Sequence, residues 1–239
     1  LAAGQGSRMG KITETIPKSL LPIGDSNIIC RLISQLIDLD CEDITVVVGY
    51  KESLLREEIN KITKKVKFVS NQRFKEDINI LSLSLALDGI SDEKFIVFEA
   101  DCIYDKQAIK HIYHSYQDKE SYWYSIGGFE PEQKGGILLS DQENKVLDIK
   151  IVNSYEKKYS AYNKLIGVLK VGVNESSKYL ELIRSYKDKD IKQYYLKPWI
   201  DNLDSLGCSE ISMSNFRSGA FNDLKEYNSI LNVFADSVK

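Results

Sequence analysis

The sequence predicts an α/β fold, and two observations carry this prediction. In the first half of the 239-residue chain, short apolar runs rich in β-branched residues alternate with amphipathic stretches, the pattern of βαβ units. In the second half, strand-like segments follow one another with short turns, as in a meander. We therefore expect a Rossmann-like three-layer α/β/α arrangement with a mixed, mainly parallel central sheet and a smaller β-rich part.

Hydrophobic periodicity places the elements of the first half. Strands are clearest at Ile44–Gly49 and Phe95–Ala100, and apolar residues recur at helical spacing in Ile28–Leu39, Lys51–Thr63, Asn79–Leu87 and Gln107–Tyr116. The chain opens on an apolar Leu1–Gly4 segment without an initiator methionine, so we expect a first strand before Leu1. Open sheets bind ligands at the carboxyl ends of their strands, which directs attention to the loops after that strand and after Ala100.

The second half is expected to be richer in strands. They are predicted at Tyr122–Gly128, Gly136–Leu139, Lys145–Val152, Leu165–Val173 and Ser209–Met213, with helices at Glu175–Tyr186, Asp190–Leu206 and Asp223–Val238. Only four prolines and no Gly/Ser-rich stretch interrupt the chain, which favours a single domain over residues 1–239.

Composition excludes several classes of protein. The chain is 43% apolar and 28% charged with a formal net charge of −3, as in an ordinary soluble globular protein. No apolar run approaches the roughly 20 residues of a membrane helix, and scattered lysines and arginines offer no footprint for nucleic acid. The four cysteines stand too far apart for a metal knuckle and are too few to staple the chain, so reduced thiols in a cytoplasm are expected.

The strongest functional signal is the opening loop. Leu1-Ala2-Ala3-Gly4-Gln5-Gly6-Ser7-Arg8-Met9-Gly10 is followed by Pro17-Lys18-Ser19-Leu20-Leu21-Pro22. Small residues at a strand exit let the backbone approach a ligand, and successive N–H groups can cradle phosphates. Two cations, Arg8 and Lys18, could converge on a polyphosphate, as a reaction that builds charge on phosphorus requires.

These residues resemble the signature of the nucleotidyltransferases that couple an NTP to a sugar phosphate or an amino-alcohol phosphate, LAAGxGxRM followed by PKxLLP. The resemblance implies that the loop backbone (Leu1, Ala2, Ala3, Gly4 and Gly6) holds the nucleotide while Arg8 and Lys18 contact its triphosphate. It also implies a nucleotide-binding part over about 1–120, an acceptor-binding part over about 121–222 and a closing helix over about 223–238.

Metal ligands are expected at two further places. Asp101 ends a predicted strand at the sheet edge, where a carboxylate can hold a Mg²⁺ that bridges phosphates, and the family resemblance implies that role for it. Asn222 matches the family's second ligand, although it could equally cap the last helix, and a one-residue slip would exchange it with Asp223. We expect Glu99 to support Asp101 or to face elsewhere.

The donor base and the acceptor depend on weaker signals. Asn79 and Ser82 resemble an NxxS-L stretch of the choline-phosphate and 2-aminoethylphosphonate cytidylyltransferases and could read a pyrimidine edge, whereas Asn79 could equally be a helix N-cap. The aromatic segment with Tyr195, Trp199 and Asp201 would suit an ammonium group, although helix packing explains its aromatic residues equally well. Lys150 is a candidate for the acceptor phosphate, or simply a solvated strand lysine.

The leading hypothesis is thus a Mg²⁺-dependent cytidylyltransferase that transfers CMP from CTP to a small amine-bearing phosphate or phosphonate, such as phosphocholine or 2-aminoethylphosphonate, and releases pyrophosphate. One alternative keeps the reaction and uses UTP or dTTP with a sugar 1-phosphate. The other is a non-catalytic nucleotide-binding regulatory module, against which the joint presence of Arg8, Lys18 and Asp101 argues. Neither nucleic acid nor a membrane is an expected partner.

Overall fold

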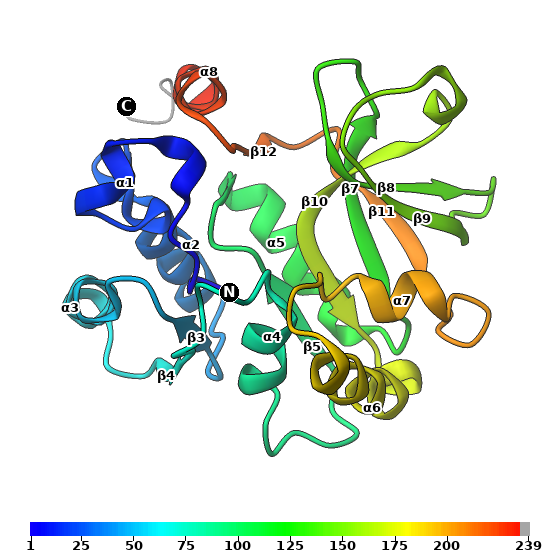
Figure 1. Ribbon diagram of the computed structural model, residues 1–239, viewed down its shortest axis with the longest axis horizontal. Coiled ribbons are helices and arrows are strands. Elements are labelled where there is room, and N and C mark those ends of the chain that lie inside the picture. The colour runs from blue at the N-terminus through cyan, green and yellow to red at the C-terminus, as the bar shows by residue number, and fades with distance from the viewer. Residues whose placement is uncertain (235–239) are drawn as a thin grey trace.

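The computed structural model describes residues 1–234, in which helices and strands form an α/β fold with a mixed sheet, as predicted (Figure 1). The strands are β1 (Pro22–Ile23), β2 (Ser26–Asn27), β3 (Thr45–Val48), β4 (Lys67–Ser70), β5 (Phe95–Phe98), β6 (Cys102–Tyr104), β7 (Tyr122–Gly128), β8 (Gly135–Ser140), β9 (Val146–Val152), β10 (Asn163–Val171), β11 (Ser209–Ser212) and β12 (Ser218–Ala220). The α-helices are α1 (Ile12–Thr15), α2 (Ile28–Ile37), α3 (Glu52–Ile62), α4 (Ile80–Ala86), α5 (Lys106–His114), α6 (Val173–Lys189), α7 (Lys197–Asp201) and α8 (Leu224–Phe234). Short 3-10 helices lie at Ser7–Met9, Lys18–Leu20, Ser115–Gln117 and Lys157–Tyr159.

Strand β10 connects the two halves of the chain. It runs antiparallel to β5, β7 and β8, while β11 is parallel to β7 and β3 is parallel to β4. Leu1–Ala3 lies between β3 and β5, because Ala2 N–H donates to Val47 O at 2.9 Å and Ala100 N–H donates to Leu1 O at 3.1 Å. Parallel pairing is less extensive than expected, since β10 opposes all three of its neighbours.

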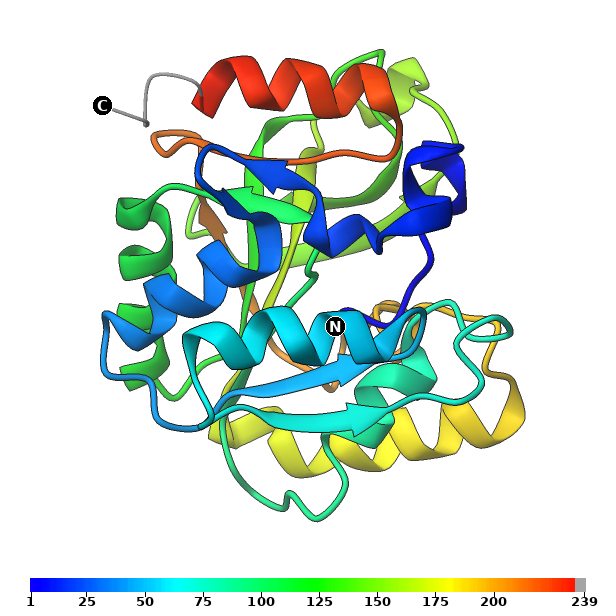
Figure 2. The same ribbon diagram turned by 90° about the vertical axis from the view of Figure 1, so that its left-hand side faces the viewer.

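Helices cover both faces of the sheet, which confirms the three-layer prediction. Adjacent strand residues point to opposite faces, and Trp123 and Tyr124 of β7 lie in different core clusters. Tyr124 shares a cluster with Leu36 of α2 and Ile109 of α5, whereas Trp123 shares one with Leu180 of α6 and with residues of α4 and α7. Figures 1 and 2 show α6 at one end of the molecule and α8 at the other.

Side-chain caps fix where two of the predicted helices begin. Asn27 accepts a hydrogen bond from Cys30 N–H at 2.9 Å at the start of α2, and Asp105 accepts one from Ala108 N–H at 2.7 Å at the start of α5. Each cap satisfies a backbone donor that the helix itself leaves unpaired. The cap at Asp105 begins α5 directly after β6.

The predicted helix over Asp190–Leu206 is wrong, because only α7 is helical in that segment. Residues 191–196 instead run beside the start of α4, with Ile78 N–H donating to Ile191 O and Ile80 N–H donating to Gln193 O, both at 3.3 Å. Pro198 then begins the short helix at a position where its missing N–H is not needed. These long-range backbone bonds outweigh the local helical pattern.

The C-terminal helix packs against the opening segment, as Figure 2 shows. α8 shares a core cluster with Met9, Leu21 and Phe221, and its Tyr227 hydroxyl donates to Pro22 O. The helix was expected over 223–238, of which residues 235–238 lie outside the described residues.

Two simpler expectations concern the whole chain. All four cysteines are free thiols, as predicted. No helix within residues 1–234 combines the length and the apolar content that a bilayer span requires.

Candidate active site

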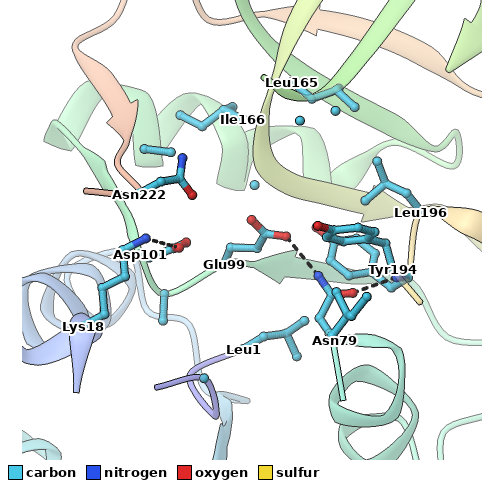
Figure 3. Close-up of a pocket in the computed structure, with 18 of the residues that line it drawn as sticks. Leu1, Lys18, Asn79, Glu99, Asp101, Leu165, Ile166, Tyr194, Leu196 and Asn222 are labelled. Carbon is cyan, nitrogen blue, oxygen red and sulfur yellow. Dashed lines mark hydrogen bonds and ion pairs between the residues drawn. The ribbon is translucent and has the colours of Figure 1, made fainter. Parts of the chain in front are cut away.

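A cavity of about 390 Å³ lies where the opening loop, the β5–β6 turn, β10 and the segment before α7 meet (Figure 3). It brings together most of the residues that the sequence singled out, although they are far apart in the chain. The predicted residues that line it are Leu1, Ala2, Ala3, Gly4, Gly6, Arg8, Lys18, Asn79, Ser82, Asp101, Tyr195 and Asn222.

The conformation of the opening loop depends on Gly6. Its φ of 71° lies in the left-handed region, where glycine carries no steric penalty. A Cβ at this position would lie only 2.8 Å from the Cβ of Lys18, so the loop packs against the aliphatic part of that lysine. The two halves of the signature are therefore in direct contact, and the exposed Arg8 lies on the same cavity.

Lys18 and Asp101 form an ion pair inside the cavity. The Lys18 Nζ lies 2.6 Å from Asp101 Oδ2, donates to Phe221 O and lies 4.5 Å from the centroid of the Phe221 ring. The lysine side chain is only 9% exposed, whereas Asp101 keeps 36% of its side chain exposed. The buried ammonium is thus neutralised, while the carboxylate can still reach a ligand in the cavity.

Asn222 is not the cap of the last helix. Asp223 accepts a hydrogen bond from Glu226 N–H at 2.9 Å and takes that role, while the Asn222 amide donates to Glu226 Oε2 at 3.2 Å. The amide oxygen of Asn222 accepts no hydrogen bond within residues 1–234, and Figure 3 shows this side chain beside the Lys18–Asp101 pair. This geometry is compatible with the metal role predicted for Asn222 over Asp223.

Glu99 faces the cavity, which the sequence interpretation left open. Burial, followed by the nearby Asp101 carboxylate, raises the pKa of Glu99 to about 7. Its carboxylate receives a hydrogen bond from the Asn79 amide at 3.4 Å (Figure 3). Glu99 and Asp101 lie two residues apart in the turn between β5 and β6, so the sequence signal was the closeness of Glu99 to a residue already assigned to the site.

Potential metal ligands cluster at the same point. Within residues 1–234, one group of three such side chains places its ligand atoms within 4.8 Å of one another, namely Glu99, Asp101 and Cys102. Carboxylate and amide oxygens suit a hard cation such as Mg²⁺, whereas a thiol does not. Burial raises the pKa of the Cys102 thiol, so it stays protonated and is a poor ligand.

Asn79 and Ser82 both line the cavity and are already hydrogen-bonded within the protein. Asn79 occupies the N-cap position of α4, but its Oδ1 accepts from Tyr195 N–H at 2.8 Å, and Asp77 instead accepts from Leu81 N–H in the first turn at 3.0 Å. Ser82 donates to Asp77 Oδ2 at 2.7 Å and accepts from Asn71 at 2.9 Å. The alternative reading of Asn79 as the N-cap is therefore right in position, although its side chain makes no capping hydrogen bond.

The structure does not bring three of the four predicted acceptor residues to the cavity. Trp199 is fully buried and donates from Nε1 to Cys208 Sγ at 3.1 Å, and Asp201 pairs with Lys197. Lys150 pairs with Asp148 on β9. Core packing and surface ion pairs account for these side chains, so of the four only Tyr195 lies on the cavity.

Two lysines that the sequence interpretation missed line the cavity instead, Lys134 and Lys164. Lys134 is exposed, whereas Lys164 is partly buried, and burial lowers the pKa of its ammonium group. In the sequence each resembles any other lysine near a strand end. Only the register of β8 against β10 reveals their position.

Comparison with known proteins identifies the family of the chain. The sequence profile of the MobA-like NTP transferase domain matches residues 1–132. The 2-aminoethylphosphonate cytidylyltransferase of Lancefieldella rimae is 32% identical over 112 residues, 46% of this chain and 44% of that protein. The UTP–glucose-1-phosphate uridylyltransferase AglF of Haloferax volcanii is 30% identical over 106 residues, 44% of this chain and 43% of that protein.

The structure of CTP:phosphocholine cytidylyltransferase LicC from Streptococcus pneumoniae matches with a TM-score of 0.79 and 21% identity, over 97% of this chain and 96% of that chain. At this identity the match shows a shared fold. The aligned region spans less than half of the two curated relatives. The resemblance that the opening motif indicated is confirmed.

Proposed function

The chain belongs to the MobA-like NTP transferase domain family, and from that premise we propose that it is a cytidylyltransferase acting on a small amine-bearing phosphate or phosphonate. An oxygen of the acceptor's phosphoryl or phosphonyl group attacks the α-phosphorus of CTP. The bond from the α-phosphorus to the β-phosphate oxygen breaks, and pyrophosphate leaves. The product carries CMP linked to the acceptor.

The observation that carries this proposal is the convergence of Lys18, Asp101 and Asn222 in one cavity with the glycine loop. No side-chain nucleophile is needed, because phosphoryl transfer depends mainly on positioning and on charge stabilisation. The buried Lys18 ammonium is held in place by Asp101 and Phe221 O, so it is oriented before the nucleotide arrives. Arg8, exposed on the same cavity, supplies a second positive charge for the pyrophosphate.

Asp101 and Asn222 would hold Mg²⁺. The fit rests on oxygen ligands at the cavity, namely the partly exposed Asp101 carboxylate and the Asn222 amide oxygen. Lys18 bonds Asp101 Oδ2, while within residues 1–234 Oδ1 accepts only a long contact of 3.8 Å from the Cys102 thiol and would keep a lone pair for the ion. When bound, the ion would neutralise negative charge on the phosphates.

The hydrogen bonds of Ser82 support CTP as donor. Its hydroxyl donates to Asp77 and accepts from Asn71, which leaves one lone pair of a residue that lines the cavity. A free acceptor of this kind suits the exocyclic amino group of cytosine, whereas uracil has a carbonyl at the same place. Similarity to the 2-aminoethylphosphonate cytidylyltransferase points the same way.

Glu99 and Tyr195 support an acceptor that carries an amine. Both line the cavity, and few hydrogen bonds satisfy the Glu99 carboxylate. A cationic ligand would compensate that charge and could also lie against the aromatic ring. A neutral sugar would offer the carboxylate only hydroxyl groups.

A substrate panel tests the proposal. Each of the four ribonucleoside triphosphates and dTTP is supplied with Mg²⁺ and with phosphocholine, 2-aminoethylphosphonate or glucose 1-phosphate, and pyrophosphate release is measured. We expect release with CTP and an amine-bearing acceptor. Release only with UTP or dTTP and glucose 1-phosphate would instead support a sugar-1-phosphate enzyme like AglF. Tight CTP binding without release in any combination would indicate a regulatory module.

Lys18→Ala supplies the matching test of the mechanism. Loss of one preorganised cation should lower turnover about 10²- to 10³-fold. Lys11→Ala is the control, because Lys11 is an exposed lysine a few residues away that does not line the cavity. Near-normal pyrophosphate release from Lys18→Ala would contradict the proposed role.

A further inference from the structure

Lys164 places an ammonium group at the cavity that the nucleotide motifs do not explain. It lies near the start of β10, where its Nζ donates to Leu165 O at 2.8 Å and to Gly136 O at 3.3 Å. Within residues 1–234 it forms no ion pair. An ammonium group has three donors, so one of them is free to bind a ligand.

The local backbone keeps this ammonium group at the cavity. Lys164 pairs with Ile137 across β10 and β8, and Gly135 and Gly136 open β8 beside it. A Cβ on Gly135 would lie 3.6 Å from Lys164 Nζ, and Gly135 has a φ of 102°, which other residues rarely adopt. The glycine pair thus leaves room for the lysine head group between the strand backbone and the cavity.

The surroundings of Lys164 favour an anionic ligand. Burial lowers the pKa of its ammonium group, while the negative charges of Glu99 and Glu226 act in the opposite direction. The described hydrogen bonds of this partly buried cation go only to neutral carbonyl oxygens, and a doubly charged phosphoryl or phosphonyl group would add the direct ion pair that Glu99 and Glu226 do not make. The other predicted candidate, Lys150, is already neutralised by Asp148 and does not line the cavity.

We propose that Lys164 binds the phosphoryl or phosphonyl group of the acceptor and holds its attacking oxygen near the α-phosphate. This inference rests on the proposed nucleotidyl transfer. It moves the acceptor's anion from the β9 lysine that the sequence indicated to β10. It also gives the acceptor site two ends, a cation at Lys164 for the phosphorus group and the Glu99 carboxylate for the amine.

The test compares Lys164→Gln with Lys164→Arg and with Lys67→Gln. Glutamine keeps a donor for the two carbonyl oxygens and removes the charge, arginine keeps the charge, and Lys67 is an exposed strand lysine on β4 away from the cavity. KM is measured separately for CTP and for the acceptor that the substrate panel identifies. Binding of that acceptor to the protein with Mg²⁺ is measured by calorimetry, and the unfolding midpoint reports on folding.

We expect Lys164→Gln to raise the acceptor KM and Kd about 10- to 100-fold, the range for a lost hydrogen bond to a charged group, with the CTP KM and the unfolding midpoint nearly unchanged. Lys164→Arg should restore part of the loss, and Lys67→Gln should behave like the natural protein. An unchanged acceptor KM in Lys164→Gln would overturn the inference, as would a rise confined to CTP or one produced by Lys150→Gln instead. Failure of the natural protein to release pyrophosphate with any acceptor would overturn the proposed function itself, a separate and earlier result.

Discussion

Gly6→Ala should lower turnover because the added methyl group displaces Lys18, although Lys18 itself is unchanged. The new methyl group would lie 2.8 Å from the Cβ of Lys18, closer than side chains pack. That carbon is fixed to the backbone of the buried 3-10 helix Lys18–Leu20, so relief requires a backbone shift of a few tenths of an ångström. The left-handed φ of 71° adds roughly 1–2 kcal/mol of strain for a residue with a Cβ.

The effect has two measurable parts. Strain of about 1–2 kcal/mol should lower Tm by about 2–8 °C in a chain of this size. Misplacement of the Lys18 ammonium, which Asp101 holds at 2.6 Å, should lower kcat about 10- to 100-fold in the pyrophosphate-release assay. Gly89→Ala is the matched control, because Gly89 also has a positive φ, of 82°, but a Cβ there would meet nothing within 4 Å. If both variants lose the same Tm and both keep full kcat, the contact between Gly6 and Lys18 has no catalytic consequence and the reasoning is refuted.

Three further predictions concern the rest of the site. Gly167→Ala would put a Cβ 2.6 Å from the Cβ of Glu99 and should raise the acceptor KM about tenfold, whereas Gly207→Ala, whose Cβ meets nothing closer than 3.9 Å, should leave it unchanged. Trp199→Ala should lower the free energy of unfolding in urea by about 3–5 kcal/mol and leave the acceptor KM unchanged. A rise in the acceptor KM as large as that of Lys164→Gln would indicate that Trp199 does contribute to acceptor binding. Burial raises the pKa of Glu99 from 4.5 to about 7, so its contribution to folding is fully present below pH 4.5 and lost as the pH rises to 7. In urea unfolding without Mg²⁺, we expect the free energy of unfolding of the natural protein to fall by about 2–3 kcal/mol more than that of Glu99→Gln as the pH rises from 4.5 to 7. Equal falls in the two proteins would contradict the raised pKa of Glu99.

The fold was predictable where local sequence and tertiary structure agree. Periodicity alone located α2 and α5, and the structure shows that Asn27 and Asp105 cap their starts, so local sequence and tertiary packing favour the same helices. The helix predicted for the segment before α7 is wrong, because the backbone of that segment hydrogen-bonds to residues 78–80, more than a hundred positions away. Short strands such as β6 and β12 carry too few residues to show a period and exist because each pairs with the other.

In the candidate site, the sequence identified single residues but not the contacts between them. The opening motif identified Lys18 and a predicted strand end identified Asp101, yet their contact joins residues 83 positions apart and depends on how β5 lies beside the opening loop. Lys150 and Lys164 illustrate what spacing cannot distinguish. Each lies on a strand of the same meander, but one is paired with an acid on its own strand and the other lines the cavity.

The Lys18–Asp101 pair also explains why the signature requires a glycine and a lysine together. An ammonium that is 9% exposed would be strongly destabilised without a partner, and the partner is the carboxylate proposed to hold the metal. Lys18 occupies one carboxylate oxygen, and in the described part of the chain the other accepts only a long contact of 3.8 Å from the Cys102 thiol, so it would remain available to the metal and the two groups would not compete. This arrangement requires the lysine to lie tightly against the opening loop, and only a residue without a side chain at Gly6 leaves space for it. The loop that would hold the phosphates and the acid that would hold the metal are in this sense one structural unit, joined by a buried lysine.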